Sequence, residues 1–285
     1  GTARSESAAE VAYHCTGCGA CTEACLHDNN VPLLLSLLRS RILDRGAAPT
    51  SVREVLGQFA VAANPSGAPL GDKLQDALQT AGVSLSKKGP VQYFPGCATL
   101  MESPESVSAF YRACSRVGAA QPATTTVSER CCGLPLLWAG SVQAFAEHAK
   151  RRAARLRGVE RLVVHDPACA AAVKHHYPRV GAPLEAEIET VASHLSRARA
   201  SDSQLAAGPA YADNCSLARS FNDGVSAPRN LLGVVQELPG GCGVEADCCG
   251  AQGLLPQTAP DTARAMAQAR IDAFRASGAE EMVVA

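Results

Sequence analysis

Short apolar runs alternate with longer amphipathic stretches through the last two thirds of the chain. Apolar runs of strand length occur at 91–94, 162–164 and 282–284. Stretches with helical spacing of apolar residues lie between them. A strand–helix–strand order of this kind favours an α/β fold with parallel sheets. We therefore expect sheets in the region that follows residue 88.

The region before residue 89 predicts helices only. Apolar residues recur at helical spacing in 31–43, 51–62 and 72–81, and a turn sequence at 64–67 separates the last two. The first of these helices is expected to bury one face in a core, formed by Leu34, Leu37, Leu38 and Ile42. This part of the chain is thus expected to be a small α-helical domain.

The first sheet-forming region predicts strands at 91–94, 124–127 and 162–164, joined by helices that end at Gly118 and Gly158. Cys114 lies on the apolar face of the first of these helices, so we expect it to be a core thiol rather than a ligand. The last strand leads directly into a loop that contains a further cysteine.

A second copy of this pattern follows about 120 residues later. Matching landmarks, shifted by 117 to 120 residues, are Cys97 and Cys215, Cys131-Cys132-Gly133 and Cys248-Cys249-Gly250, and Gly158 and Gly278. A repeat this long is a duplicated domain rather than a solenoid unit. The predicted domains are a helical one over 1–88, a first repeat over 89–207 and a second repeat over 208–285.

Composition narrows the function classes. The chain has 285 residues, 47% of them hydrophobic, and a formal net charge of −1. A balanced charge without a Lys/Arg block disfavours nucleic acid and anionic membrane surfaces as partners, and 4% aromatic residues leave few stacking platforms for bases. No stretch approaches the ~20 apolar residues of a membrane span, so no intrinsic membrane segment is expected.

Thirteen cysteines are too many for thiols without a role. A disulfide scaffold is one interpretation, but the number is odd, no signal-like apolar stretch precedes Cys15, and many cysteines are adjacent or two residues apart. A chain of this size also has enough core not to need disulfides. These features favour a metal-binding protein in a reducing, cytoplasmic compartment.

The most specific motif has the spacing C-x2-C-x2-C-x3-C, formed by Cys15, Cys18, Cys21 and Cys25. This spacing is typical of a cubane [4Fe–4S] site, and it fits a zinc tetrahedron less well. No further cysteine occurs before Cys97, so Cys25 most simply completes the same cluster. His14 and His27 flank the motif and are expected to be exposed.

The remaining cysteines follow the carboxyl ends of predicted strands, the edge at which open α/β sheets bind ligands. Loops distant in sequence are therefore expected to bring together Cys97, Cys131, Cys132 and Cys169. The second repeat offers Cys215, Cys248 and Cys249, and its Cys169 equivalent would fall beyond Ala285, so a truncated end is expected. We expect His175 and His176 to face solvent, and Cys242 to be a surface thiol.

The duplicated pattern resembles the CCG-domain (cysteine-rich domain) family of iron–sulfur oxidoreductases, which includes heterodisulfide reductase B-type and D-type subunits and glycolate oxidase iron–sulfur subunits. The resemblance implies two α/β CCG domains after a ferredoxin-like one, and a noncubane [4Fe–4S] cluster held by five cysteines. Here Ala172 replaces the last cysteine of the first motif. The first site is thus expected to hold another cluster, a zinc ion or nothing. The noncubane cluster is expected at the second site, completed beyond the chain end.

These observations predict an iron–sulfur electron-transfer subunit that relays electrons between a flavoprotein partner and a CCG-domain site. One alternative is a catalytic subunit that reduces a disulfide at a noncubane cluster, as the resemblance implies for heterodisulfide reductases. A second alternative is a zinc-stabilised structural subunit. Whether the chain is itself an enzyme is left open by its residues.

Overall fold

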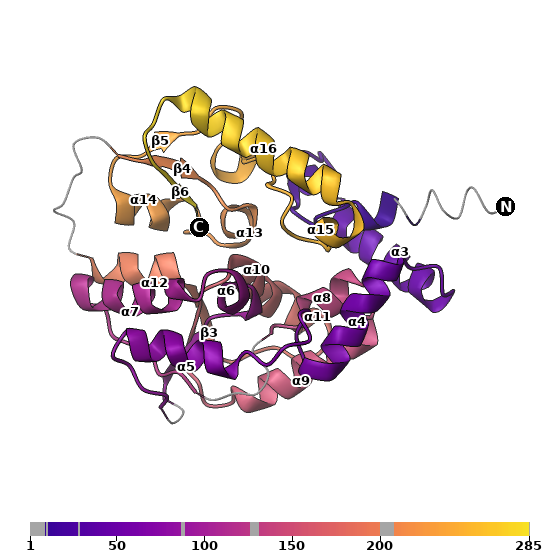
Figure 1. Cartoon of the computed structure of the whole chain (residues 1–285), viewed down its shortest axis with the longest axis horizontal. Coiled ribbons are helices and arrows are strands. Elements are labelled where there is room, and N and C mark those ends of the chain that lie inside the picture. Colours follow the sequence, from indigo (N-terminus) through magenta and orange to yellow (C-terminus); the bar gives the residue numbers. More distant parts are fainter. Residues whose placement is uncertain are drawn as a thin grey trace.

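The computed structural model describes residues 9, 11–27, 29–86, 89–125, 131–199 and 208–284. A helical N-terminal segment is followed by two α/β repeats, which lie one above the other in Figure 1. The repeats meet through α10 (Pro167–Ala171) against α13 (Cys215–Ser220) and α12 (Val191–Ala198) against α14 (Ser226–Leu232). The predicted domain boundaries at 87–88 and 200–207 lie outside the described residues and remain predictions.

Four helices of the N-terminal segment have complete bounds, and they are α2 (Ala20–Glu23), α3 (Val31–Asp44), α4 (Thr50–Ala62) and α5 (Gly71–Thr80). The predicted helices at 31–43, 51–62 and 72–81 are confirmed to within one residue. The side chain of Asn30 caps α3 by accepting a hydrogen bond from the backbone N–H of Leu33 at 3.0 Å. Helix α5 packs on α7 (Glu105–Val117) of the first repeat, so the helical segment and that repeat share a core.

The face that α3 buries differs from the expected one. Leu34 and Leu37 are 59% and 53% exposed, so the prediction that they join the core is wrong. The buried stripe instead contains Ile42 and Arg39, flanked by the partly buried Leu35 and Leu38. Arg39 can occupy this stripe because its guanidinium donates to the carbonyls of Ala12, Trp138 and Cys15, at 2.8, 3.1 and 2.5 Å. A buried arginine therefore rotates the helix away from the orientation that its leucines predict.

The first repeat contains a parallel sheet with strand order β1-β2-β3. Its strands are β1 (Val91–Phe94), β2 (Arg161–Val164) and β3 (Glu187–Thr190). Its α-helices are α6 (Cys97–Glu102), α7 (Glu105–Val117), α8 (Leu134–Trp138), α9 (Val142–Arg155), α10 (Pro167–Ala171), α11 (Tyr177–Arg179) and α12 (Val191–Ala198). A π-helical turn at Ala172–His176 joins α10 to α11.

Two of the three predicted strands of this repeat are confirmed, and the third is not. Near 124–127 the structure has a single bridge from Ala123 to Gln92, and residues 126–127 lie outside the described part. The third strand is β3, which the apolar pattern does not indicate because it alternates with glutamates. Glu189 is nevertheless buried, since Arg161, Arg197 and His194 all approach its carboxylate.

The protonation of His194, a member of this charge cluster, is expected to make the stability of the protein depend on pH. Its Nε2 faces the Ala120 carbonyl at 2.9 Å and its Nδ1 faces Glu189 at 3.2 Å, so both nitrogens can donate only in the imidazolium form. Hydrogen bonds to Cys114 and Glu189 raise the pKa of His194 to about 10. Because folding raises this pKa, the charged form of His194 stabilises the folded protein fully below about pH 6.5, the ordinary pKa of histidine. This stabilisation is lost as the pH rises through about 10. We expect the midpoint temperature of thermal unfolding to fall between about pH 6.5 and pH 10 in the wild type, and to fall less in His194→Gln. The same fall in both proteins would contradict this role of His194.

The second repeat is a smaller copy with a parallel sheet ordered β5-β4-β6. Its strands are β4 (Ala210–Ala212), β5 (Gln236–Glu237) and β6 (Met282–Val284). Its helices are α13 (Cys215–Ser220), α14 (Ser226–Leu232), the 3-10 turn Gly243–Glu245, α15 (Leu255–Thr258) and α16 (Pro260–Ser277). The predicted strand at 282–284 is confirmed, and α16 ends directly before Gly278, the glycine that matches Gly158. Among the described residues, no helix has the length and apolar character needed to cross a membrane.

Candidate metal centres

The four cysteines of the first repeat lie together at the carboxyl edge of its sheet. Cys97 begins α6 directly after β1, Cys131 and Cys132 precede α8, and Cys169 lies in α10 after β2. All four side chains are buried. The Sγ atoms of Cys97 and Cys131 are 3.3 Å apart, and Cys132 accepts from the thiols of Cys131 and Cys169. The convergence predicted from the strand ends is therefore present.

The same sulfur-binding turn occurs in all three cysteine segments. In each, a glycine two residues after a cysteine has a positive φ of 74° to 85° and directs its backbone N–H at the cysteine Sγ. The donor–sulfur distances are 3.3, 3.4 and 3.4 Å for Gly17 to Cys15, Gly133 to Cys131 and Gly250 to Cys248. Such N–H···S bonds are the contacts by which proteins tune iron–sulfur clusters. Glycine is required because other residues rarely adopt this φ.

The pKa values of the buried thiols indicate that this site requires a positive charge when the thiols are ionised. Burial and hydrogen bonds to Cys132 and Cys97 raise the pKa of Cys131, and the hydrogen bond to Cys132 and burial raise that of Cys169. The pKa of Cys132 is lowered, because Cys131 and Cys169 stabilise its thiolate. Ionising all of these thiols away from water requires nearby positive charge, which a metal centre supplies. The soft, buried sulfur set therefore fits an iron–sulfur or other thiophilic centre.

Three polar residues that support this site are not indicated by the cysteine spacing. His148 Nε2 lies 3.0 Å from the Cys131 carbonyl, and the Tyr177 hydroxyl donates to the Cys132 carbonyl at 2.8 Å. The Asp166 carboxylate accepts from the Cys169 N–H at 2.8 Å and caps α10. His148 could have been noticed as a polar residue on the apolar face of α9, because the buried residues of that helix follow helical spacing.

The N-terminal motif occupies the surface beside these repeats. Cys15, Cys18 and Cys25 are half-buried, whereas Cys21 is exposed at the start of α2. Arg39 holds the Cys15 carbonyl, and Trp138, which follows the first cysteine pair, lies next to Gly17. The motif is thus anchored to the folded protein on the side of Cys15, with Cys21 towards solvent.

The second-repeat cysteines are arranged differently from those of the first. Cys215 is buried at the start of α13, Cys248 is half-buried and Cys249 is exposed. Cys248 has both Cys215 and Cys18 of the N-terminal motif as neighbours that shift its pKa, and its Sγ lies 3.3 Å from the Thr16 hydroxyl of that motif. The hydrogen bond to Cys248 and burial raise the pKa of Cys18, whereas the hydrogen bond from Cys248 lowers that of Cys215. The structure therefore joins two sets of cysteines that the sequence leaves separate.

None of the thirteen cysteines, all within the described residues, forms a disulfide. Across the described part of the chain, no group of three or more Cys, His, Asp or Glu side chains lies close enough together to hold a metal ion. The zinc interpretation remains a prediction.

Other predicted positions are mostly as expected. Cys114 is buried, and Cys242, His14 and His27 are exposed. The prediction that the histidine pair faces solvent is wrong, because His175 and His176 are half-buried. They lie in the π-helical turn after α10, at the contact with the second repeat, where His175 Nε2 is 2.9 Å from the Ser220 carbonyl.

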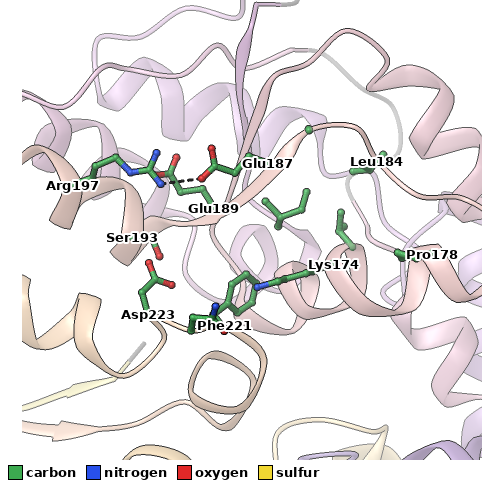
Figure 2. A pocket seen from close by; sticks show the side chains of 13 residues that line it. Lys174, Pro178, Leu184, Glu187, Glu189, Ser193, Arg197, Phe221 and Asp223 are labelled. Carbon is green, nitrogen blue, oxygen red and sulfur yellow. Dashed lines mark hydrogen bonds and ion pairs between the residues drawn. The ribbon is translucent and has the colours of Figure 1, made fainter.

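A pocket of about 430 Å³ lies at the junction of the two repeats, beside β3. Figure 2 shows Arg197 near Glu187 and Glu189 on one side, and Lys174 over the ring of Phe221 on the other. The Lys174 ammonium is 4.1 Å from that ring centroid, a cation–π contact between the repeats. No cysteine lines this pocket, so it is separate from the thiol sites.

Comparison with known proteins agrees with the geometry. The sequence profile of the family described as CCG, cysteine-rich domain, matches residues 91–174 and 210–285, which lie in the first and the second α/β repeat. No solved structure shows a significant match to the chain.

Curated relatives are similar over nearly the whole chain. The B-type subunit of fumarate reductase (CoM/CoB) from Methanothermobacter marburgensis is 24% identical over 271 residues, covering 92% of this chain and 53% of the relative. The D-type subunit of dihydromethanophenazine:CoB–CoM heterodisulfide reductase is 27% identical over 283 residues in both Methanosarcina barkeri and Methanosarcina mazei, covering 91% of this chain and 66% of each relative. The chain thus spans between about half and two thirds of the length of these relatives. With the family profile covering both repeats, the chain belongs to the CCG cysteine-rich domain family.

Proposed function

We propose that this chain is an iron–sulfur electron-transfer subunit of an oxidoreductase complex, which relays electrons between a flavoprotein partner and its cysteine-rich sites. One observation supports the proposal: three loops distant in sequence bring four buried thiols to one sheet edge, where Cys97 contacts Cys131 and Cys132 lies beside Cys131 and Cys169. Apolar packing alone does not require four thiols at one point, whereas a soft metal centre does.

The residues divide into three ligand sets under this proposal. Cys15, Cys18, Cys21 and Cys25 would hold a [4Fe–4S] cluster. The first repeat would hold a second centre, a cluster or zinc, with Cys97, Cys131, Cys132 and Cys169. A noncubane [4Fe–4S] cluster would be held in part by Cys215, Cys248 and Cys249. Bound clusters of this kind supply one-electron chemistry.

The protein's own contribution is to bury and orient the sulfurs. Gly17, Gly133 and Gly250 direct N–H groups at them, while His148 and Tyr177 hold the carbonyls of the first cysteine pair. Such contacts set ligand orientation and cluster potential. The names of the relatives describe reductase subunits, which supports a role that depends on a partner.

Anaerobic reconstitution with iron and sulfide, followed by mixing with a chemically reduced flavin, tests the relay. We expect visible absorbance that bleaches on mixing, with a paramagnetic resonance signal appearing at the same rate. In Cys21→Ala, the repeat centres should still load but be reduced more slowly. A reconstituted chain without absorbance, or with absorbance that no reductant bleaches, would exclude the relay.

A second candidate is reduction of a disulfide at the second-repeat site. The names of the Methanosarcina relatives favour it, and Cys249 is exposed to an incoming substrate. Turnover of a disulfide with a reduced dye as donor would support it if Cys249→Ala abolished the activity. Cys242→Ala, which changes another exposed cysteine of the same repeat, should leave it intact. Equal loss in both variants would argue against a specific site.

A further inference from the structure

The contact between the N-terminal motif and the second repeat joins residues more than 200 positions apart. Cys248 is the central residue: it lies beside the loop of Cys18, to whose carbonyl Arg219 donates at 3.0 Å, and the thiols of Cys18 and Cys215 are the neighbours that shift its pKa. Its Sγ also lies 3.3 Å from the Thr16 hydroxyl, and Thr16 is buried. The loop of Cys248 therefore lies against the N-terminal motif, with the thiols of Cys18 and Cys215 as neighbours of Cys248.

Arg219 ties the backbones of these segments together. It lies on α13, one turn after Cys215, and its guanidinium donates to the carbonyls of Cys18, Val244 and Ala246 at 3.0, 2.9 and 2.6 Å. The last two carbonyls belong to the loop that leads to Cys248. The Arg219 guanidinium thus holds the loop of Cys18 next to the loop of Cys248.

Close backbone packing provides a second, independent connection. A Cβ at Gly253 would overlap the Cys15 carbonyl oxygen and lie 2.6 Å from the Cα of Thr16. The Thr258 hydroxyl donates to the Tyr13 carbonyl at 2.9 Å. The segment after Cys248 is therefore seated directly on the N-terminal motif, with no room for a side chain between them.

In the first repeat, by contrast, the thiol contacts all lie within that repeat. The N-terminal motif precedes the first repeat in the chain, yet its thiol contact is with the second.

We propose that Cys18, Cys248 and Cys215 form one continuous thiol site across this contact, held together by Arg219, so that the metal groups of the N-terminal motif and the second repeat are direct neighbours. The inference rests on the proposed iron–sulfur function for the identity of those groups. The thiol site itself is a property of the folded chain and can be tested without metal.

The test uses the full-length, cluster-free chain and the bifunctional thiol reagent dibromobimane, which links two thiols only when they are close together. Tryptic digestion and mass spectrometry should find a link between peptides 5–39 and 230–264, which contain Cys18 and Cys248. Cys18→Ser should abolish this link, and Cys21→Ser, a change in the same motif, should preserve it. Absence of the link in the wild type, or its persistence in Cys18→Ser, would overturn the proposal.

Matched glycine variants test the seating of the two segments. Gly253→Ala places a Cβ against Cys15 and Thr16 at a φ of +73°, whereas Gly278→Ala has a φ of +71° and open space around its Cβ. We expect the yield of the link to fall about tenfold in Gly253→Ala and in Arg219→Gln, since each disrupts the contact. It should be unchanged in Gly278→Ala and in Arg275→Gln, a change at an exposed arginine of α16. Equal yields in Gly253→Ala and Gly278→Ala would overturn the proposed seating.

The metal-loaded chain provides a separate readout. Two neighbouring paramagnetic centres broaden or split each other's resonance, so the reduced N-terminal cluster should give a broadened signal that sharpens in Cys248→Ala. A chain that forms the link but takes up no iron would contradict the proposed function and leave the thiol site standing. A chain that loads both segments but forms no link would contradict the thiol site alone.

Discussion

Replacing Cys132 with alanine is expected to remove the metal of the first repeat completely, whereas replacing Cys114 is expected to leave it in place. Both side chains are buried in the same repeat, at 2% and 0% exposure, so each change deletes one sulfur from a packed core. In the metal-free chain the stability cost should therefore be similar, about 1 kcal/mol. The difference in metal content between the two variants therefore reports the loss of a metal ligand, and not the loss of packing that both variants share.

The physical reason is the central position of Cys132 among the four thiols. It is hydrogen-bonded to Cys131 and Cys169, and its lowered pKa makes it the thiolate that forms first. A centre that loses this ligand loses a negative charge in a buried site that has few other donors. Metal analysis should show the loss, while the resonance signal of the Cys15–Cys25 cluster persists. Full metal retention in Cys132→Ala, or equal metal loss in Cys114→Ala, would contradict this assignment.

Gly140→Ala is expected to be among the most destabilising single substitutions in the N-terminal half. Gly140 has a φ of +89°, and a Cβ there would lie 2.5 Å from the carbonyl carbon of Arg39 and 2.7 Å from the N of Ser40. These atoms belong to the backbone of α3, so the helix itself must move. Left-handed strain and overpacking together should cost about 3 kcal/mol or more. Displacing α3 also withdraws Arg39 from the Cys15 carbonyl, so loading of the N-terminal cluster should fall as well.

Gly158→Ala is the matched control. Gly158 has a φ of +74° but open space around its Cβ, so only the backbone strain applies, about 1 kcal/mol. Urea unfolding of both variants, with iron content measured on the same samples, separates strain from steric contact. If both variants lost the same stability, α3 would not be seated on Gly140 as described.

The sequence predicted the repeated strand–helix pattern because its signals are local. Apolar runs mark β1, β2 and β6, and Gly118, Gly158 and Gly278 follow the ends of helices, each with a positive φ. The grouping of the first-repeat cysteines was also predictable, since each follows the carboxyl end of a strand or precedes a helix at the same sheet edge. The duplication made the second repeat predictable from the first.

The parts that could not be predicted depend on burial of charge and on long-range contacts. Strand β3 has no apolar run, because Glu189 is buried by an arginine and histidine cluster assembled from other elements. The face of α3 is set by Arg39, whose hydrogen-bond partners lie as far away as Trp138. The meeting of Cys18 with Cys248 leaves no trace in residue spacing, because only the folded chain brings them together.

Iron–sulfur chemistry at these thiols is the central claim. The most direct measurement is the iron, zinc and acid-labile sulfide content of anaerobically prepared chain, with electron paramagnetic resonance on the same sample. We expect iron and sulfide in nearly equal amounts, with about four iron atoms for each [4Fe–4S] cluster and a signal that appears on reduction. Zinc without iron, or a chain that stays colourless after reconstitution, would contradict the claim.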